Sequence, residues 1–100
     1  MHEVTVLDGA EGHLQGLYNR FIALGEEHAF RFDQSVDEAL SLFSWSPELS
    51  PRYRGRIRRL VLLEWGIGLF YAVEARRVII VGAMDLRQDP TQIDRWLEQF

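Results

Sequence analysis

The sequence predicts an α+β protein in which a helical hairpin packs on a sheet of four mainly antiparallel strands. Three patterns carry this prediction. A short alternating segment opens the chain, two amphipathic helical patterns follow, and three strand-like runs fill much of the second half. A last helical pattern after Pro90 completes the order β-α-α-β-β-β-α. With 100 residues, the chain suffices for one domain covering residues 1–100.

The first half divides into one strand and two helices. Residues 2–7 alternate well enough for a strand, and Asp8 with Glu11 forms a capping-box pattern that predicts a helix start at Asp8. Gly25 is the expected stop, and Glu26 favours a second helix start through the helix dipole. The expected apolar stripes are Ala10, Leu14, Leu17, Phe21 and Leu24, then Ala29, Phe32, Val36, Ala39, Leu40 and Phe43.

The second half reads as an antiparallel meander and a short helix. Turn residues fill 46–51, and Trp45 before them is expected to anchor the hairpin against the sheet. Strand-like runs cover residues 56–63, 67–73 and 77–84, with connections short enough for hairpins. Trp65 falls in the first connection, either exposed or packed on a strand end. Asp89 and Pro90 predict the start of the last helix.

Both faces of the middle strands are apolar, although the helical hairpin covers only one of them. A last helix of about ten residues covers only part of the second face. We therefore expect an apolar patch on that face to bind a partner.

Charge is divided unevenly along the chain. The net charge is −4, with −7 in residues 1–50 and +3 in residues 51–100. All 11 cations are arginine, so no lysine is available for Schiff-base chemistry. The count of zero cysteines excludes disulfides, thiolate catalysis and cysteine metal sites. No apolar run spans a bilayer and no leader pattern opens the chain, so a soluble, cytoplasmic protein without membrane contact is expected.

The densest feature is a run of five arginines, which could bind phosphates or the acidic residues of a protein. Its alternative role is a solvated strand edge that discourages aggregation. Strand alternation places Arg56 and Arg58 on one face and Arg59 on the other. The run consists of Arg52, Arg54, Arg56, Arg58 and Arg59.

RNA cleavage would need a base, an acid and a cation. Arg59 and Arg87 are the candidates for the cation, and Tyr71 or Asp85 for the proton transfers. The three histidines fall in the first strand and the hairpin, away from these residues. No His and acid cluster has the spacing of metal ligands, and no cofactor is expected.

Taken in order, the strands resemble the core of the RelE/ParE toxins of type II toxin–antitoxin systems. The resemblance covers nearly the whole chain, including the helical hairpin. It is carried by YRGRIRRLVL at residues 53–62, GIGLFYAVE at 66–74, VIIVGAM at 78–84 and LRQDP at 86–90.

The resemblance implies a growth-inhibiting toxin of the plasmid-stabilisation type that a cognate antitoxin neutralises, as a homodimer or as a heterotetramer with the antitoxin. Lacking lysine and a tyrosine in the tail, the chain is closer to the ParE branch, which implies DNA gyrase as target. The alternatives are a RelE-like, ribosome-dependent mRNA endoribonuclease and a non-toxic interaction module. The residues expected to bind the target or antitoxin are Arg54, Arg56, Arg58, Arg59, Trp65, Tyr71 and Arg87.

Overall fold

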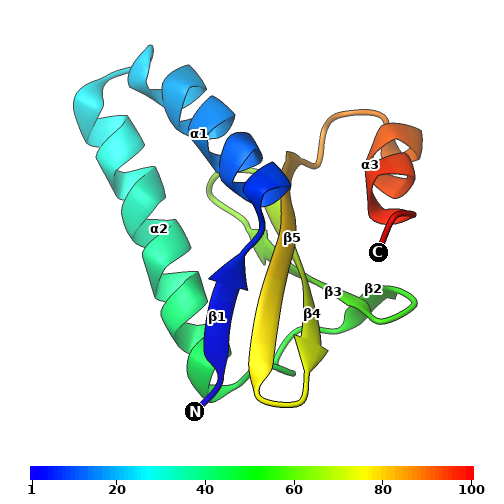
Figure 1. Ribbon diagram of the computed structural model, residues 1–100. Helices are drawn as coiled ribbons and strands as arrows, with labels where there is room; N and C mark the ends of the chain where they lie inside the picture. The colour runs from blue at the N-terminus through cyan, green and yellow to red at the C-terminus, as the bar shows by residue number, and fades with distance from the viewer.

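The computed structural model describes residues 1–100 and confirms the α+β class. Two long helices form a hairpin on one side of a twisted sheet, and a short third helix lies on the other side (Figure 1). None of the helices combines the length and the hydrophobicity that crossing a membrane requires. The elements are β1 (Glu3–Val6), α1 (Asp8–Ile22), α2 (Glu26–Trp45), β2 (Arg52–Arg54), β3 (Ile57–Leu62), β4 (Ile67–Glu74), β5 (Arg77–Asp85) and α3 (Pro90–Leu97).

The sheet has the strand order β1-β5-β4-β3-β2. β1 pairs with β5 in parallel, and the other neighbours are antiparallel. The register between β4 and β5 shifts at Phe70 and Tyr71, where Phe70 faces Gly82 and Tyr71 faces Ile80. Val81 is therefore the extra residue of a bulge in β5.

The prediction of four strands is wrong by one, because the sheet has five. The additional strand is β2, whose Arg52 and Arg54 pair with Arg58 and Ile57 of β3. Gly55 makes this pairing geometrically accessible, since its φ of +54° lies in the left-handed region that favours glycine. The chain can thus turn back at once from β2 into β3.

The start of α1 also differs from its prediction. Asp8 is the first helical residue and not a cap, since the residue before the helix is Leu7 and no side chain caps the end. The Leu7 amide donates to the Ile80 carbonyl at 3.1 Å, which prolongs the strand pairing up to the helix. The acidic side chains of Asp8 and Glu11 still lie in the first turn, where their negative charges interact favourably with the positive end of the helix dipole.

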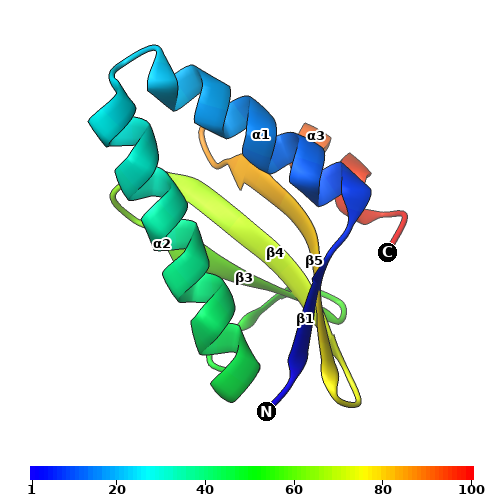
Figure 2. The ribbon, with the colours of Figure 1, turned by 60° about the vertical axis from the view of Figure 1, so that its left-hand side comes forward.

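The first core fills the space between the hairpin and the sheet. Figure 2 shows α1 and α2 crossing this face of the sheet, with α3 behind it. The predicted stripes are buried apart from Leu14 and Leu40, which are partly buried, and Leu24, which is 71% exposed beyond the end of α1. Trp45 was expected to anchor the hairpin, but it is 70% exposed. It lies in the last turn of α2, past the stripe that faces the sheet.

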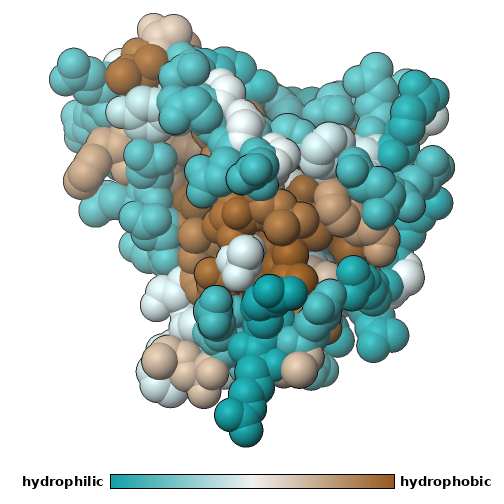
Figure 3. Space-filling view, in the orientation of Figure 1, coloured by the Kyte–Doolittle hydropathy of each residue, from teal (hydrophilic) through white to brown (hydrophobic).

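The second face of the sheet is better covered than predicted. Phe70, Ala72, Ile79 and Val81 are all buried there, in a core completed by Ile57 and Met84 of the sheet and by α3. Tyr53 of β2 and the chain end at Phe100 pack on the same core, which adds cover that α3 alone would not provide. Hydrophobic side chains remain visible in the middle of this face (Figure 3). The large apolar patch expected on this face is thus reduced to these side chains.

Candidate functional site

The five arginines of β2, β3 and the turn between them are distributed over both faces of the sheet. Arg58 faces the hairpin side opposite Tyr71, and Arg59 lies beside Tyr53, a residue of the second core. Arg56 and Arg58 line one common pocket, as the alternation predicted. Each face therefore presents a different set of cations.

Arg58 has a structural role in this conformation. Its side chain is only 14% exposed, and its guanidinium donates to the Ser50 carbonyl at 2.7 Å and to the Glu48 carboxylate at 3.4 Å. These bonds fix the loop between α2 and β2. Arg56 pairs with Glu74 at 2.9 Å, and this hydrogen bond lowers the pKa of Glu74.

A polar group on the second face links β2 and β3 to α3. The Tyr53 hydroxyl donates to the Asp94 carboxylate at 3.0 Å, and the Arg59 guanidinium lies 4.9 Å from the centre of the Tyr53 ring. Arg54 donates to the Asp94 carbonyl at 3.3 Å and lies 3.9 Å from Glu98. Burial and the bond to Asp94 raise the pKa of Tyr53, so its hydroxyl stays protonated at neutral pH.

Asp85 and Arg87 form an ion pair at the far end of β5. The Arg87 guanidinium donates to both carboxylate oxygens, at 2.9 and 3.0 Å, and Arg20 of α1 contacts the same group at 3.0 Å. The bonds from Arg87 hold the pKa of Asp85 far below its usual range despite its partial burial. Asp85 therefore stays ionised as the shared partner of Arg20 and Arg87, and its carboxylate is a poor proton acceptor.

Two predicted contact residues are buried, which corrects the expectation that they face a partner. Tyr71 is 0% exposed and its ring stacks on Phe43 at 4.1 Å. Trp65 is 6% exposed, surrounded by aromatic residues of α1 and α2, and its indole donates to the Ser35 hydroxyl at 3.2 Å. The hairpin is long enough to cover both side chains.

The four candidates for RNA cleavage are not assembled into one site. Arg59 lies on the second face, Tyr71 in the core under the hairpin, and Asp85 with Arg87 at the end of β5. The histidines also lie apart from Arg59. His13 of α1 accepts a hydrogen bond from the Ala83 amide at 3.2 Å, and burial lowers its pKa. No group of three His, Asp or Glu side chains has a geometry that could hold a metal ion.

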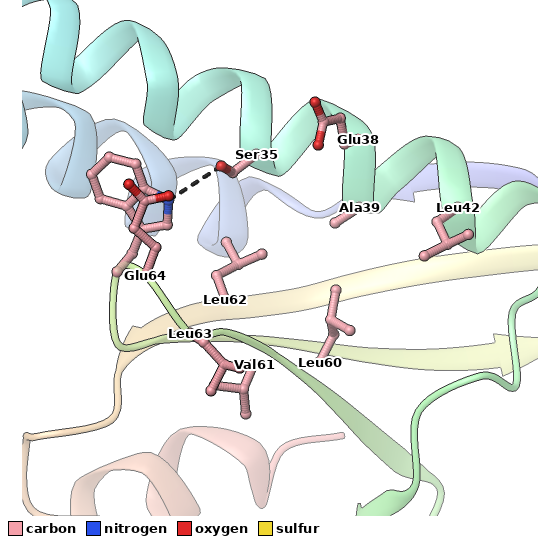
Figure 4. A pocket seen from close by; sticks show the side chains of 10 residues that line it. Ser35, Glu38, Ala39, Leu42, Leu60, Val61, Leu62, Leu63 and Glu64 are labelled. Carbon is pink, nitrogen blue, oxygen red and sulfur yellow. Dashed lines mark hydrogen bonds between the residues drawn. The ribbon is translucent and has the colours of Figure 1, made fainter.

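An apolar pocket of about 310 Å³ opens between α2 and β3. Leu60 and Leu62 point from β3 toward α2, where Leu42 faces them (Figure 4). Leu42 is 47% exposed, and Leu63 beside the pocket is 88% exposed. We call this surface the α2–β3 groove and define it by Ala39, Leu42, Leu60, Leu62 and Leu63.

The α2–β3 groove adjoins an open edge of the sheet. β2 pairs with β3 only up to Arg58, so no strand lies outside the segment from Leu60 to Leu62. Backbone groups at such an edge are free to pair with another extended chain. The groove therefore combines apolar side chains with strand-pairing capacity.

Comparison with solved structures reveals the same architecture in another protein. A chain in the structure titled "Chromosomal ParDE TA system from P. aeruginosa" matches with a TM-score of 0.74 and 19% identity, covering 87% of this chain and 98% of that chain. The two chains share a fold. No protein-family model matches the sequence, and no curated protein matches it. The comparison confirms the architecture that the RelE/ParE resemblance implied.

Within this fold, sequence reasoning missed two features of the surface. Tyr53 and Asp94 meet across 41 positions of sequence, which no local pattern could indicate. The strand β2 was not predicted either, and it covers the edge of β3 only as far as Arg58. A signal for the groove did exist, since Leu60, Leu62 and Leu63 lie in a run that is apolar at consecutive positions and supplies both faces of the strand.

Proposed function

We propose that this protein is the toxin of a type II toxin–antitoxin pair and that a cognate antitoxin neutralises it by binding the α2–β3 groove. The fold shared with a chain of a ParDE system is the observation that carries the proposal. The exposed leucines of the groove and the open edge of β3 give such a partner a place to bind. An antitoxin segment with apolar anchors would cover the leucines while its backbone extended the sheet.

The partner can be tested by co-expressing the chain with the protein encoded in the neighbouring reading frame. We expect a complex in size-exclusion chromatography and relief of any growth arrest. The variant Leu63→Asp should weaken the complex, since it places a charge in the groove. Leu24→Asp is a matched control, because Leu24 is also exposed but lies at the turn between α1 and α2. Equal weakening by both variants would contradict the location, and failure to form any complex would contradict the pairing.

We further propose a ParE-like activity, in which the protein inhibits DNA gyrase in the cytoplasm. The four residues expected to cleave RNA, which are Arg59, Tyr71, Asp85 and Arg87, lie apart, and this supports a protein target over a nucleic-acid substrate. Purified protein should inhibit DNA supercoiling by gyrase, and co-purified antitoxin should restore it. Undiminished supercoiling at a large molar excess of the protein would contradict this target.

A second candidate is cleavage of mRNA, as in the RelE branch. One observation favours it, the gathering of Tyr53, Asp94 and the cations Arg54 and Arg59 on the second face. Mapping of RNA ends after induction distinguishes the two activities. New ends that disappear in an Arg59→Ala variant would favour the nuclease. Growth without arrest in every case would leave the fold as an interaction module.

A further inference from the structure

A second pocket with a different chemistry lies at the end of the molecule where the N-terminus, the loop after α2 and the turn between β4 and β5 meet (Figure 1). Its volume is about 260 Å³. Three arginines and one glutamate line it, so the lining carries a formal charge of +2 when the histidine is neutral. The lining residues are His2, Glu48, Arg52, Arg56, Arg58, Val73 and Ala75.

The arginines of this pocket are arranged at a cost to the fold. Arg52 of β2 and Arg58 of β3 are direct cross-strand partners. Like charges directly opposite each other in an antiparallel pair are destabilising. A bound anion between them would convert this repulsion into two charge-assisted contacts.

The guanidinium groups retain free hydrogen-bond donors. Arg52 makes no ion pair and no side-chain hydrogen bond, although the neighbouring Arg56 and Arg58 both do. Each guanidinium carries five N–H donors, and Arg58 uses its bonds to Ser50 and Glu48 to hold its position. The pocket thus contains one fixed arginine, Arg58, one available arginine, Arg52, and a third, Arg56, that is paired with Glu74.

The size and lining of the pocket select the ligand class. It is smaller than the range of about 300–1,000 Å³ typical of pockets for whole small molecules. It also has no Phe, Tyr or Trp among its lining residues, and its apolar lining is limited to Val73 and Ala75. A compact dianion with several acceptor oxygens fits this description, and a phosphate monoester carries between one and two negative charges at neutral pH.

We propose that this pocket binds a phosphate monoester group, as inorganic phosphate or as the terminal phosphate of a small molecule. The proposal is independent of the toxin function and of the α2–β3 groove, which lies on another part of the surface. It assigns a ligand-binding role to Arg52, a residue whose side chain makes no ion pair and no hydrogen bond within the protein.

The test is a titration of isotope-labelled protein with inorganic phosphate and, separately, with a nucleoside monophosphate, followed by NMR. We expect saturable shifts of the amides around Arg52, Arg58 and Val73 with both probes. Equal affinities would identify the phosphate group itself as the ligand, and tighter binding of the nucleotide would identify a larger ligand. An oligonucleotide without a terminal phosphate carries only phosphodiester groups. If it competes as well as inorganic phosphate, the proposal is overturned in favour of binding to a nucleic-acid backbone.

Variants locate the site. Arg52→Gln should weaken phosphate binding by about tenfold to a hundredfold, since charge-assisted hydrogen bonds are lost. Arg95→Gln is the matched control. Arg95 is exposed on α3 and makes no ion pair or side-chain hydrogen bond, and its replacement by Gln removes the same positive charge. Arg52→Lys preserves the charge without the planar fork and should give an intermediate loss. Equal effects of Arg52→Gln and Arg95→Gln, or no saturable shifts, would overturn the proposal.

Discussion

Tyr71 carries a buried hydroxyl group without a hydrogen-bond partner in the protein, one of two such side-chain hydroxyls in the structure. Its ring contributes by stacking on Phe43, but the hydroxyl loses its hydration without compensation. Ser50, whose carbonyl accepts from Arg58, carries the other such hydroxyl. The stabilising part of Tyr71 is therefore its ring.

Replacing Tyr71 by Phe should leave the free energy of unfolding unchanged or raise it by up to about 1 kcal/mol, because an unsatisfied group is removed. Chemical denaturation measures this directly. Tyr71→Ala is the contrasting variant and should cost about 3–5 kcal/mol through the cavity it leaves. A loss above about 1 kcal/mol in Tyr71→Phe would show that the hydroxyl is bonded, for instance through a buried water.

The ion pairs of Asp85 give a pH dependence of defined sign. Its pKa is lower in the folded than in the unfolded state, where about 3.9 is usual, so the group stabilises the fold above that pH and loses its effect below it. Asp85→Asn should cost about 1.5–3 kcal/mol at pH 7. The difference from wild type should shrink between about pH 5 and pH 2 in denaturation experiments.

Asp33 provides a control of opposite sign, since burial and the neighbouring Asp37 raise its pKa. Asp33→Asn should therefore not lower the stability at pH 7. A stability of Asp85→Asn equal to wild type at pH 7 would contradict the role of the ion pairs.

At the scale of the elements, a single side chain connects α3 to α1 and β5. The Trp96 indole donates to the Val81 carbonyl at 2.8 Å, at the bulge of β5, and its ring meets His13 edge-on at 4.7 Å. It fits because α1 and β5 present glycines to it. A Cβ atom at Gly9 would lie 2.6 Å from the Trp96 ring, and one at Gly82 would lie 3.1 Å from it.

Two substitutions within α1 should therefore have opposite effects. Gly9→Ala should destabilise the protein by about 1–3 kcal/mol, since its methyl group collides with Trp96. Gly12→Ala meets open space and should stabilise it by up to about 1 kcal/mol through helix propensity. Thermal unfolding with tryptophan fluorescence monitors both variants. Equal melting temperatures for the two variants would show that the packing of α3 does not depend on the space that Gly9 leaves for the Trp96 ring.

Most elements could be predicted from the sequence because their periodicity is strong, as in the helical hairpin and in β4. β2 was missed because it is only three residues long, and the sequence Arg-Tyr-Arg is too short to show the alternation of apolar and polar residues that predicts a strand. Its existence depends on the turn at Gly55 and on the strand it meets. The capping box at Asp8 failed for a related reason, since pairing of Leu7 with β5 determines where α1 begins.

The candidate site was harder to predict than the fold. Alternation correctly separated Arg58 from Arg59, a local property of a strand. The burial of Trp65 depends on how far the helical hairpin extends over the sheet. The hydrogen bond between Tyr53 and Asp94 depends on where α3 packs against the second face of the sheet. Such tertiary relations leave no periodic signal in the sequence.

At the scale of the whole molecule, exposed apolar side chains gather mainly beside α2. Leu42, Trp45, Leu49 and Leu63 all belong to this side, and each is at least 43% exposed. A protein with such a surface gains apparent stability from a partner that covers it, because binding to the folded state alone shifts the folding equilibrium.

We expect the complex with an antitoxin to unfold at a higher temperature than the isolated chain. At a free antitoxin concentration of 100 times the Kd, the gain is about 2.7 kcal/mol. Calorimetry of both samples at several antitoxin concentrations measures it. A melting temperature that does not change with concentration would show that the partner binds folded and unfolded chains alike.

The position of β5 between β1 and β4 has a consequence for folding during synthesis on the ribosome. The first strand finds its only neighbour in a strand made some seventy residues later, with Glu3 beside Arg77. Until β5 emerges, β1 has no sheet to join and β4 lacks one of its two neighbours. The hairpin, although complete by Trp45, has until then only part of its sheet to cover. An interrupted translation would thus release an unfolded fragment, and any activity that depends on the fold would appear only with nearly full-length chains.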